Sequence, residues 1–337
     1  LRVVACEIGP ATVYTGNVLE VRMTVTNPSQ TTLYSSDPPP GYIYEEGVDF
    51  AAAGFPKIQD TYRFGIDYTS NNGTVNPYRW GFGAPLVPGE ERDVVGYVRV
   101  KRRRTVTWTA SVVKEYVRYL VEDEFPRRIA VADPPVDPVP PLDDGESRYF
   151  SETGHNVPRA FARYWDANGG LARFGYPLTE AFEEVSLTDG GRYLTQYFER
   201  ARFEYHPEYA GTKDEVLLGL LGVELTVDRR TESEFRPISR PEGETGRIWF
   251  PETGHTLGGR FLTYWETNGG LPIFGYPISE EFRERSRTDG EYHTVQYFER
   301  NRFEYHPNYA GTKDEIMLGH LAREALILRG WLKGAAG

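Results

Sequence analysis

The stretch that decides the fold is QYFERARFEYHP at residues 196–207, which returns as QYFERNRFEYHP at residues 296–307 with one change. The agreement extends in both directions. Of the 72 positions in residues 150–221, 44 are identical to the position 100 residues later, without an insertion or deletion. Such agreement indicates that one unit was duplicated. We therefore expect two equivalent surfaces rather than one composite active site.

Each copy predicts a short helix near its start. Phe161, Tyr164 and Trp165 have the i, i+3, i+4 spacing of one helical face, and the same residue types recur 100 positions later. Asn156 and Thr256 stand where a helix N-cap is expected. An Asn-Gly pair follows, which tolerates the left-handed conformation at which such a helix ends.

The second half of each copy predicts a hairpin. Thr188-Asp189-Gly190 is a turn signal, and residues 193–198 and 202–205 read as the strands that follow it. Residues 215–221 form an apolar run that is either a strand or a helix, because periodicity does not separate the two in so short a segment. Each copy is therefore expected to be an α+β unit.

The first 132 residues carry a different pattern. Leu19, Val21, Met23 and Val25 alternate with polar residues, as in a half-buried strand. Further strands are predicted at residues 93–100, 106–112, 116–121 and 127–131, with Lys101–Arg104 as a solvated turn. Several short strands with frequent turns predict a β-sandwich. The aromatic residues of the long loop 36–57 either meet a partner or fold back over an open edge of the sandwich.

The domain organisation follows from these patterns. A segment with five prolines favours an extended, semi-rigid spacer and marks one boundary. The predicted order is an all-β sandwich at 1–132, a Pro-rich linker at 133–147, repeat 1 at 148–228, a polar linker at 229–246 and repeat 2 at 247–333.

A polar face of each hairpin is the candidate binding surface. Strand alternation puts Phe203 and Tyr205 on one face and charged residues on the other. This second face is expected to be exposed, either as a ligand-binding surface or as an ion-paired solvent face. Trp165 and Trp265, one from each predicted helix, are further binding candidates, and packing in the core is the alternative role. The candidate binding residues are Glu199, Arg200, Arg202, Glu204, His206, Trp165 and their equivalents Glu299, Arg300, Arg302, Glu304, His306, Trp265.

The sequence contains none of the nucleophile, zinc, phosphate-loop or calcium-loop motifs that mark common enzymes. A glycoside hydrolase would need two carboxylates at a defined separation, which a sequence does not show. Its candidates are Glu152, His155, Glu199, Glu204, His206 and Asp214, with their equivalents in the second copy. Because both copies keep these residues, shared folding needs or bivalent binding explain them better. We therefore expect no enzyme activity, no catalytic residue, no metal site and no cofactor.

Composition narrows the partners. The net charge of −11 argues against a nucleic-acid partner, since such binding depends on Lys and Arg. No run approaches the roughly 20 apolar residues of a membrane span. Scarce Cys and Met beside 24 Pro resemble the composition of heat-tolerant proteins. The first residue is Leu, which fits a mature exported protein whose export signal was removed and equally fits a chain that was trimmed artificially.

Two resemblances give a more specific expectation. Gly169-Gly170-Leu171, the Phe-Gly-Tyr-Pro turn at residues 174–177 and the QYFER strand resemble the LGFP repeat family over residues 168–221 and 268–321. That family occurs on exported bacterial proteins and is thought to hold its carrier to the cell envelope through polysaccharide. Residues 6–27 and 86–90 resemble immunoglobulin-like modules of bacterial surface proteins.

Three classes of function remain open. The first is a non-catalytic, extracellular or cell-surface protein whose repeats bind envelope polysaccharide or another surface partner, with two weak sites gaining avidity. The second is a structural subunit that binds copies of itself in a surface layer or extracellular filament. The third is a glycoside hydrolase. The first two are favoured over the third.

Overall fold

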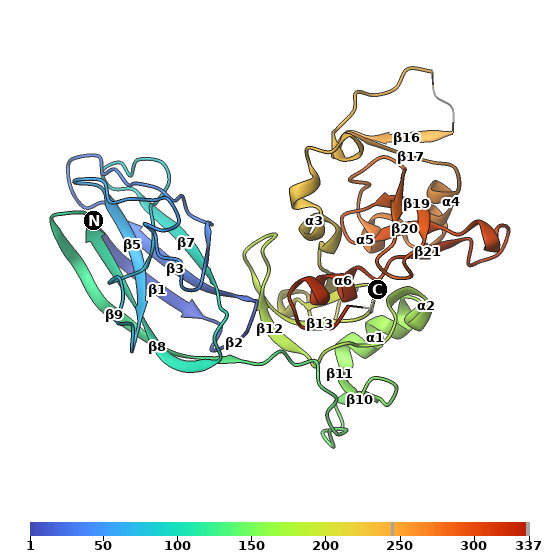
Figure 1. Cartoon of the computed structure of the whole chain (residues 1–337), viewed down its shortest axis with the longest axis horizontal. Helices are drawn as coiled ribbons and strands as arrows, with labels where there is room; N and C mark the ends of the chain where they lie inside the picture. Colours follow the sequence, from blue (N-terminus) through green and yellow to red (C-terminus); the bar gives the residue numbers. More distant parts are fainter. Residues whose placement is uncertain (244–245, 335–337) are drawn as a thin grey trace. The chain divides into compact units, whose positions relative to one another are not determined.

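The computed structural model describes residues 1–243 and 246–334 (Figure 1). The chain divides into two compact units, which are Leu1–Pro134 with Glu183–Val185 (unit 1) and Pro135–Phe182 with Ser186–Gly337 (unit 2). Strands hold 38% of the chain and helices 16%, so the protein is β-rich and multidomain. Among the described residues, the helices are all too short or too polar to cross a membrane.

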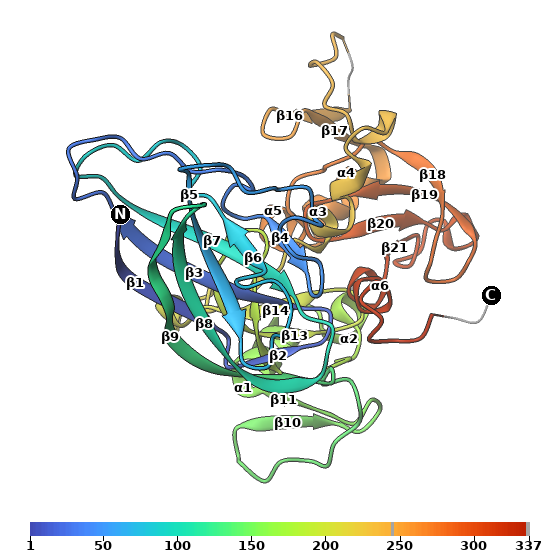
Figure 2. The same cartoon turned by 60° about the vertical axis from the view of Figure 1, so that its left-hand side comes forward.

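Unit 1 consists of two sheets that enclose one hydrophobic core. The first sheet has the order β1 (Arg2–Gly9), β3 (Val18–Thr26), β7 (Glu91–Arg99), β4 (Ile43–Glu45). The second has the order β2 (Thr12–Tyr14), β9 (Arg118–Ala132), β8 (Arg104–Lys114), β5 (Tyr62–Tyr68), β6 (Tyr78–Trp80). Most neighbours are antiparallel, whereas β4 and β2 each pair in parallel with a longer strand. Two sheets around one core form a sandwich, whose strands Figure 2 shows from a second side.

The predicted core face of β3 is confirmed, because its four alternating apolar residues, from Leu19 to Val25, are all buried. In the long loop, Tyr44 and Phe50 are also buried and join the same core. Tyr44 lies on β4, which pairs with β7 at one edge, whereas Phe50 packs against Arg63 of β5 and Arg79 of β6 in the other sheet. The two strands predicted at 116–121 and 127–131 are instead one strand, β9, whose pairing with β8 shifts register several times. A register shift lets one strand continue through residues that do not alternate.

Unit 2 contains both copies of the repeat, apart from Glu183–Val185 of the first copy, and each copy has the same order of strands and helices. Repeat 1 consists of β10 (Ser147–Phe150), β11 (His155–Pro158), α1 (Arg159–Ala167), α2 (Gly170–Phe174), β12 (Phe182–Val185), β13 (Arg192–Tyr197), β14 (Arg202–Tyr205), η1 (Pro207–Tyr209), β15 (Val216–Leu218) and α3 (Leu221–Leu225). Repeat 2 consists of β16 (Arg247–Phe250), β17 (His255–Gly258), α4 (Gly259–Thr267), α5 (Gly270–Phe274), β18 (Phe282–Arg285), β19 (Tyr292–Tyr297), β20 (Arg302–Tyr305), η4 (Pro307–Tyr309), β21 (Ile316–Leu318) and α6 (Leu321–Leu328). Two short turns lie between them, η2 (Val227–Arg229) and η3 (Ser233–Phe235).

Each repeat has a two-stranded hairpin followed by a four-stranded antiparallel sheet. The sheets have the orders β12-β13-β14-β15 and β18-β19-β20-β21. The apolar run at 215–221, which the sequence leaves undecided, is the strand β15 followed by the first residue of α3. The helix cap expected at Asn156 and Thr256 is wrong, since both residues lie inside hairpin strands and the helices begin three residues later without a side-chain cap.

The two repeats share one hydrophobic core, to which both contribute the same aromatic residues. Reciprocal hydrogen bonds join them. Arg200 Nε donates to Leu318 O at 3.3 Å, and Arg300 Nε donates to Leu218 O at 3.1 Å. Backbone hydrogen bonds are reciprocal in the same way, since one joins α3 to repeat 2 and another joins α6 to repeat 1. Such reciprocity is typical of an isologous interface, here formed within one chain.

The Pro-rich segment is not a free spacer, which corrects the expectation from its composition. Val139 N donates to Gly154 O at 2.8 Å, and Glu180 N donates to Pro135 O at 2.8 Å, so the segment runs along repeat 1. The polar segment before repeat 2 makes matching bonds, from Ile238 N to Gly254 O and from Glu280 N to Glu234 O. Both segments therefore belong structurally to the repeat that follows them.

Candidate functional site

The polar face predicted to be exposed is buried. Arg202, Glu204 and His206 retain only 2%, 6% and 5% of their accessible surface, and Arg302 and Glu304 retain 1% and 3%. The expectation of an exposed face is therefore wrong for these residues. These residues can be buried because the helix that follows the sheet carries a glutamate, 22 residues after the arginine in the sequence, and this glutamate pairs with the arginine of this face.

Each buried arginine is held between two carboxylates. Arg302 Nη2 lies 2.5 Å from Glu304 Oε1 and 2.8 Å from Glu324 Oε1 on α6. Its Nη1 donates to the Tyr297 hydroxyl at 3.1 Å. In repeat 1, Arg202 contacts its two carboxylates in the same way, at 2.6 and 2.7 Å. A buried charge needs such complete pairing.

The electrostatics of Glu304 fit this structural role. Burial by itself would raise the pKa of the carboxyl, but His306, the charge of Arg302 and the hydrogen bonds from Arg302 and Ser286 together lower the pKa to about 2. Glu304 is therefore a permanent anion at neutral pH. A group that stays ionised and is enclosed in this way cannot act as a general acid at neutral pH.

Glu199 and Arg200, with their equivalents in repeat 2, serve the interface between the repeats. They lie in the turn between β13 and β14, where Tyr176 N donates to Glu199 Oε2 at 3.3 Å. In repeat 2, Tyr276 N donates to Glu299 Oε2 at 2.9 Å. The arginines make the reciprocal bonds described above. The identity of these residues in the two copies therefore has a structural explanation.

Trp165 and Trp265 are packing residues. Trp165 Nε1 donates to Gly175 O at 3.0 Å, and its ring lies edge-on to Phe150. Trp265 makes the equivalent bond to Gly275 O at 3.1 Å. Both rings are partly buried against the shared core. The core alternative therefore accounts for both tryptophans.

The histidine of the hairpin, considered above as a catalytic candidate, also has a partner inside its repeat. His155 Nδ1 lies 3.1 Å from Glu180 Oε1, and His255 Nδ1 lies 3.2 Å from Glu280 Oε1. Burial lowers the pKa of His155, although the adjacent Glu180 opposes this effect. Both carboxylates also accept a backbone N–H of the hairpin, so the pair fixes the hairpin to its sheet.

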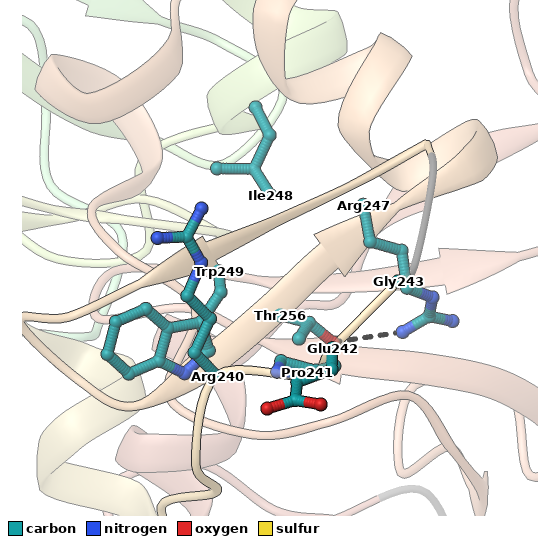
Figure 3. Close-up of a pocket in the computed structure, with 8 residues that line it drawn as sticks. All are labelled: Arg240, Pro241, Glu242, Gly243, Arg247, Ile248, Trp249 and Thr256. Carbon is teal, nitrogen blue, oxygen red and sulfur yellow. Dashed lines mark hydrogen bonds between the residues drawn. The ribbon is translucent and has the colours of Figure 1, made fainter.

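A hollow with a volume of about 740 Å³ lies beside the β16–β17 hairpin (Figure 3). Trp249 Nε1 donates to Ile238 O at 3.2 Å, which fixes the indole at the edge of the hollow. Arg247 donates to Thr256 Oγ1 at 3.0 Å and contacts Glu281 at 3.1 Å. The residues that line the hollow are Arg240, Pro241, Glu242, Gly243, Arg247, Ile248, Trp249 and Thr256.

Repeat 1 presents an aromatic residue at the equivalent place. Tyr149 pairs with Asn156 across β10 and β11, as Trp249 pairs with Thr256 across β16 and β17. Tyr149 is exposed, and Trp249 is half-buried. The two hairpins lie at opposite ends of unit 2 in both views (Figures 1 and 2). Unit 2 thus carries two separate aromatic residues at matching positions of the two hairpins.

The hairpin residues are absent from the sequence-based candidates, which were chosen among positions identical in the two copies. Tyr149 and Trp249 differ from each other, as do Ser147 and Arg247. The signal that could have identified them is chemical, since an aromatic residue stands at the same place in both hairpins.

Comparison with known proteins gives no further assignment, because the sequence matches no family model and no curated protein. The functional conclusion therefore depends on the geometry of the hairpins and on the sequence patterns.

Proposed function

We propose that this chain is a non-catalytic, exported cell-surface protein that binds envelope polysaccharide through the β10–β11 and β16–β17 hairpins. The observation that carries the proposal is the hollow beside β16–β17, whose lining includes the indole of Trp249, two arginines and a glutamate. An open hollow of this kind suits a chain-like ligand better than a small enclosed one.

The chemistry of the hollow fits a sugar. The apolar face of a pyranose ring packs on an aromatic side chain, and Trp249 offers such a side chain while its N–H is already bonded to Ile238 O. The guanidinium group of Arg240 offers planar donors for hydroxyl or acidic groups, whereas Arg247 is held by Thr256 and Glu281 and adds positive charge to the wall of the hollow. Glu242 offers acceptors for hydroxyl donors. The mixed charge makes a polysaccharide that carries uronic acids or phosphate the best match.

The duplication supports bivalent binding. Two weak sites on one rigid unit convert the second binding step into an intramolecular one, which raises apparent affinity by about 10² to 10⁴. A repetitive polysaccharide is the kind of ligand that two equivalent sites at opposite ends of a unit can bind together. The permanent core between the repeats keeps the spacing of the sites constant.

The finer classification of the fold is part of the same proposal. We infer that the repeats are LGFP-like α+β units derived from one ancestor, which the matching order of strands and helices supports. We also infer that residues 1–132 are an immunoglobulin-like module that acts as a spacer. Its two mainly antiparallel sheets around one core support this inference.

The test is binding of the purified protein to bacterial cell-wall sacculi that do or do not carry their attached polysaccharide. Trp249→Ala and Tyr149→Ala should each reduce binding to the complete sacculi at least about 10-fold, because loss of either site removes avidity. Tyr116→Ala is the matched control, since Tyr116 is 67% exposed but lies in unit 1. The control variant should bind like the original protein.

Three results would count against the proposal. Equal binding of all variants to the complete sacculi would show that the hairpins do not bind the polysaccharide. Ordered polymers of the pure protein, with no polysaccharide binding, would favour the surface-layer or filament alternative. Release of reducing ends from the polysaccharide, abolished by Glu199→Gln combined with Glu299→Gln, would favour the glycoside hydrolase alternative.

A further inference from the structure

Repeat 2 contains a cluster of potential metal ligands. One ligand atom each from Asp289, His293 and His306 lies within 4.8 Å of the others. His293 is the second residue of β19, and His306 directly follows β20. Since Thr294 pairs with Tyr305, the two histidines stand opposite each other on neighbouring strands, with ring centroids 4.1 Å apart.

The third residue comes from the turn that precedes β19. Glu291 N donates to Asp289 Oδ1 at 3.0 Å, which fixes the carboxylate. Its other oxygen, Oδ2, lies 2.8 Å from His293 Nε2. Asp289 is 40% exposed at its side chain, whereas His293 is only 9% exposed. The cluster is therefore open on the carboxylate side and closed on the imidazole side.

Two nitrogens of this cluster are buried without a hydrogen bond. Within the described residues, His293 Nδ1 and His306 Nε2 both have no hydrogen-bond partner. Buried polar atoms are normally satisfied, so such atoms need an explanation. His306 Nε2 lies 3.6 Å from Glu304 Oε2, which is an ion-pair contact, consistent with the effect of His306 on the pKa of Glu304, but is longer than a hydrogen bond. A second carboxylate beside a ligand histidine is a recurrent feature of metal sites, where it orients the ring.

Repeat 1 shows how the same place differs when a tyrosine takes the position of His293. The hydroxyl of this residue, Tyr193, donates to Asp189 Oδ2 at 3.0 Å. His206 still packs on the ring at 4.2 Å, but its Nδ1 lies 2.9 Å from Glu208 Oε1. Position 308 in repeat 2 is Asn, which has no carboxylate. Repeat 2 therefore has a histidine in place of a tyrosine and lacks a competing carboxylate.

We propose that repeat 2 binds one divalent transition-metal ion, with Zn²⁺ as the best match, through Asp289, His293 and His306. This departs from the sequence-based expectation of no metal site. Two imidazoles and a carboxylate are a ligand set that Zn²⁺ accepts, with water in the remaining position. Mg²⁺ and Ca²⁺ prefer oxygen ligands and do not fit.

The spacing of the ligand atoms requires only a small adjustment. Zn–ligand bonds of about 2.0–2.2 Å imply ligand atoms about 3.4 Å apart in a tetrahedral site. The ligand atoms of the cluster lie within 4.8 Å of one another, and the Asp289 carboxylate is exposed enough to rotate. Rotation of this side chain and small shifts of the two rings bring the cluster to the required spacing.

The test is calorimetric titration of the full chain, without a histidine tag, with ZnCl₂. The original protein should bind one Zn²⁺. His293→Tyr, which installs the residue of repeat 1, should weaken binding at least about 100-fold, since loss of an outer partner alone costs about 10- to 100-fold. His206→Gln removes a histidine at the equivalent place in repeat 1 and should leave binding unchanged. Thermal unfolding of each variant checks that its fold is retained.

A second variant tests the metal ligands by a gain of binding rather than a loss. Tyr193→His combined with Glu208→Asn copies the cluster into repeat 1 and should raise the stoichiometry from one to two. Bound Co²⁺ should give the visible absorption of a four-coordinate site in the original protein and lose it in His293→Tyr. Equal Zn²⁺ affinity in the original protein and His293→Tyr would overturn the proposal, as would an unchanged stoichiometry in the double variant.

Discussion

Replacement of Arg302 by Met should strongly destabilise unit 2. The Arg302 side chain is 1% exposed, and its partners Glu304 and Glu324 are 4% and 7% exposed. Met matches the length of the apolar part of the side chain, so the packing volume is largely kept while the positive charge is removed. Removing one partner of a buried ion cluster costs about 3–5 kcal/mol, because the remaining charges are left uncompensated. Here two carboxylates are left beside each other.

The assay is thermal unfolding followed by calorimetry. Unit 2 spans about 200 residues, for which each kcal/mol shifts Tm by about 2–4 °C, so the expected decrease is about 6–20 °C. The equivalent change in repeat 1, Arg202→Met, should cost less. Its partner Glu224 is 16% exposed and keeps Arg329 at 3.8 Å. Arg283→Met is the control, because Arg283 is exposed and surface changes stay within about 0.5 kcal/mol.

Two outcomes would refute this reasoning. One is a Tm decrease below about 2 °C for Arg302→Met, which would mean that the cluster is open to water. The other is an equal decrease in Tm for Arg202→Met and Arg302→Met. Such a result would mean that the solvent exposure of the partner carboxylates does not control the cost of losing the arginine. A variant that combines Arg302→Met with Glu304→Leu and Glu324→Leu removes all three charges together and should recover most of the lost stability.

Three further predictions follow from single residues. The pKa of Glu304 is about 2 in the folded protein and 4.5 ordinarily, so ionised Glu304 contributes about 3 kcal/mol to the free energy of unfolding. This contribution is present above pH 4.5 and is lost as the pH falls towards 2. The Tm should therefore decrease over that pH range, and should decrease less steeply in Glu304→Gln. Gly275 has φ 77° and ψ −170°, a backbone region that only glycine occupies readily. Gly275→Ala should therefore lower the free energy of unfolding, measured by urea denaturation, by about 1–3 kcal/mol. Gly73 does not have a positive φ, so Gly73→Ala is the control and should be near neutral. Burial and the neighbouring Glu7 raise the pKa of Cys6 to about 12, so Cys6 should react with iodoacetamide at about pH 8 far more slowly than free cysteine.

Local patterns in the sequence are sufficient to predict much of the fold. The period-two alternation around Leu19–Val25 identifies a strand and its buried face, because both properties depend only on neighbouring residues. The turn signal at Thr188–Gly190 likewise identifies the hairpin that joins β12 and β13. In both places the information lies within about ten residues.

Long-range packing could not be predicted in the same way. Arg202 and Glu204 alternate as an exposed polar face would, and only the distant carboxylate of Glu224 shows why they are buried. The shared core of the repeats is a further case. A sequence repeat shows that two units are alike, but it does not show that each needs the other to cover its apolar surface.

The shared core changes how the duplication is interpreted. Positions such as Phe174, Phe203 and Arg200 are identical in the two copies because each contributes to packing or to the reciprocal interface, so their identity reflects stability. The positions that differ are then the informative ones for function. Trp249 in place of Tyr149, and His293 in place of Tyr193, keep an aromatic ring and change what that ring can bind. We therefore propose that the two copies have a common scaffold on which repeat 2 carries the more specialised sites. A variant that exchanges these residues between the copies should then move binding without changing the fold.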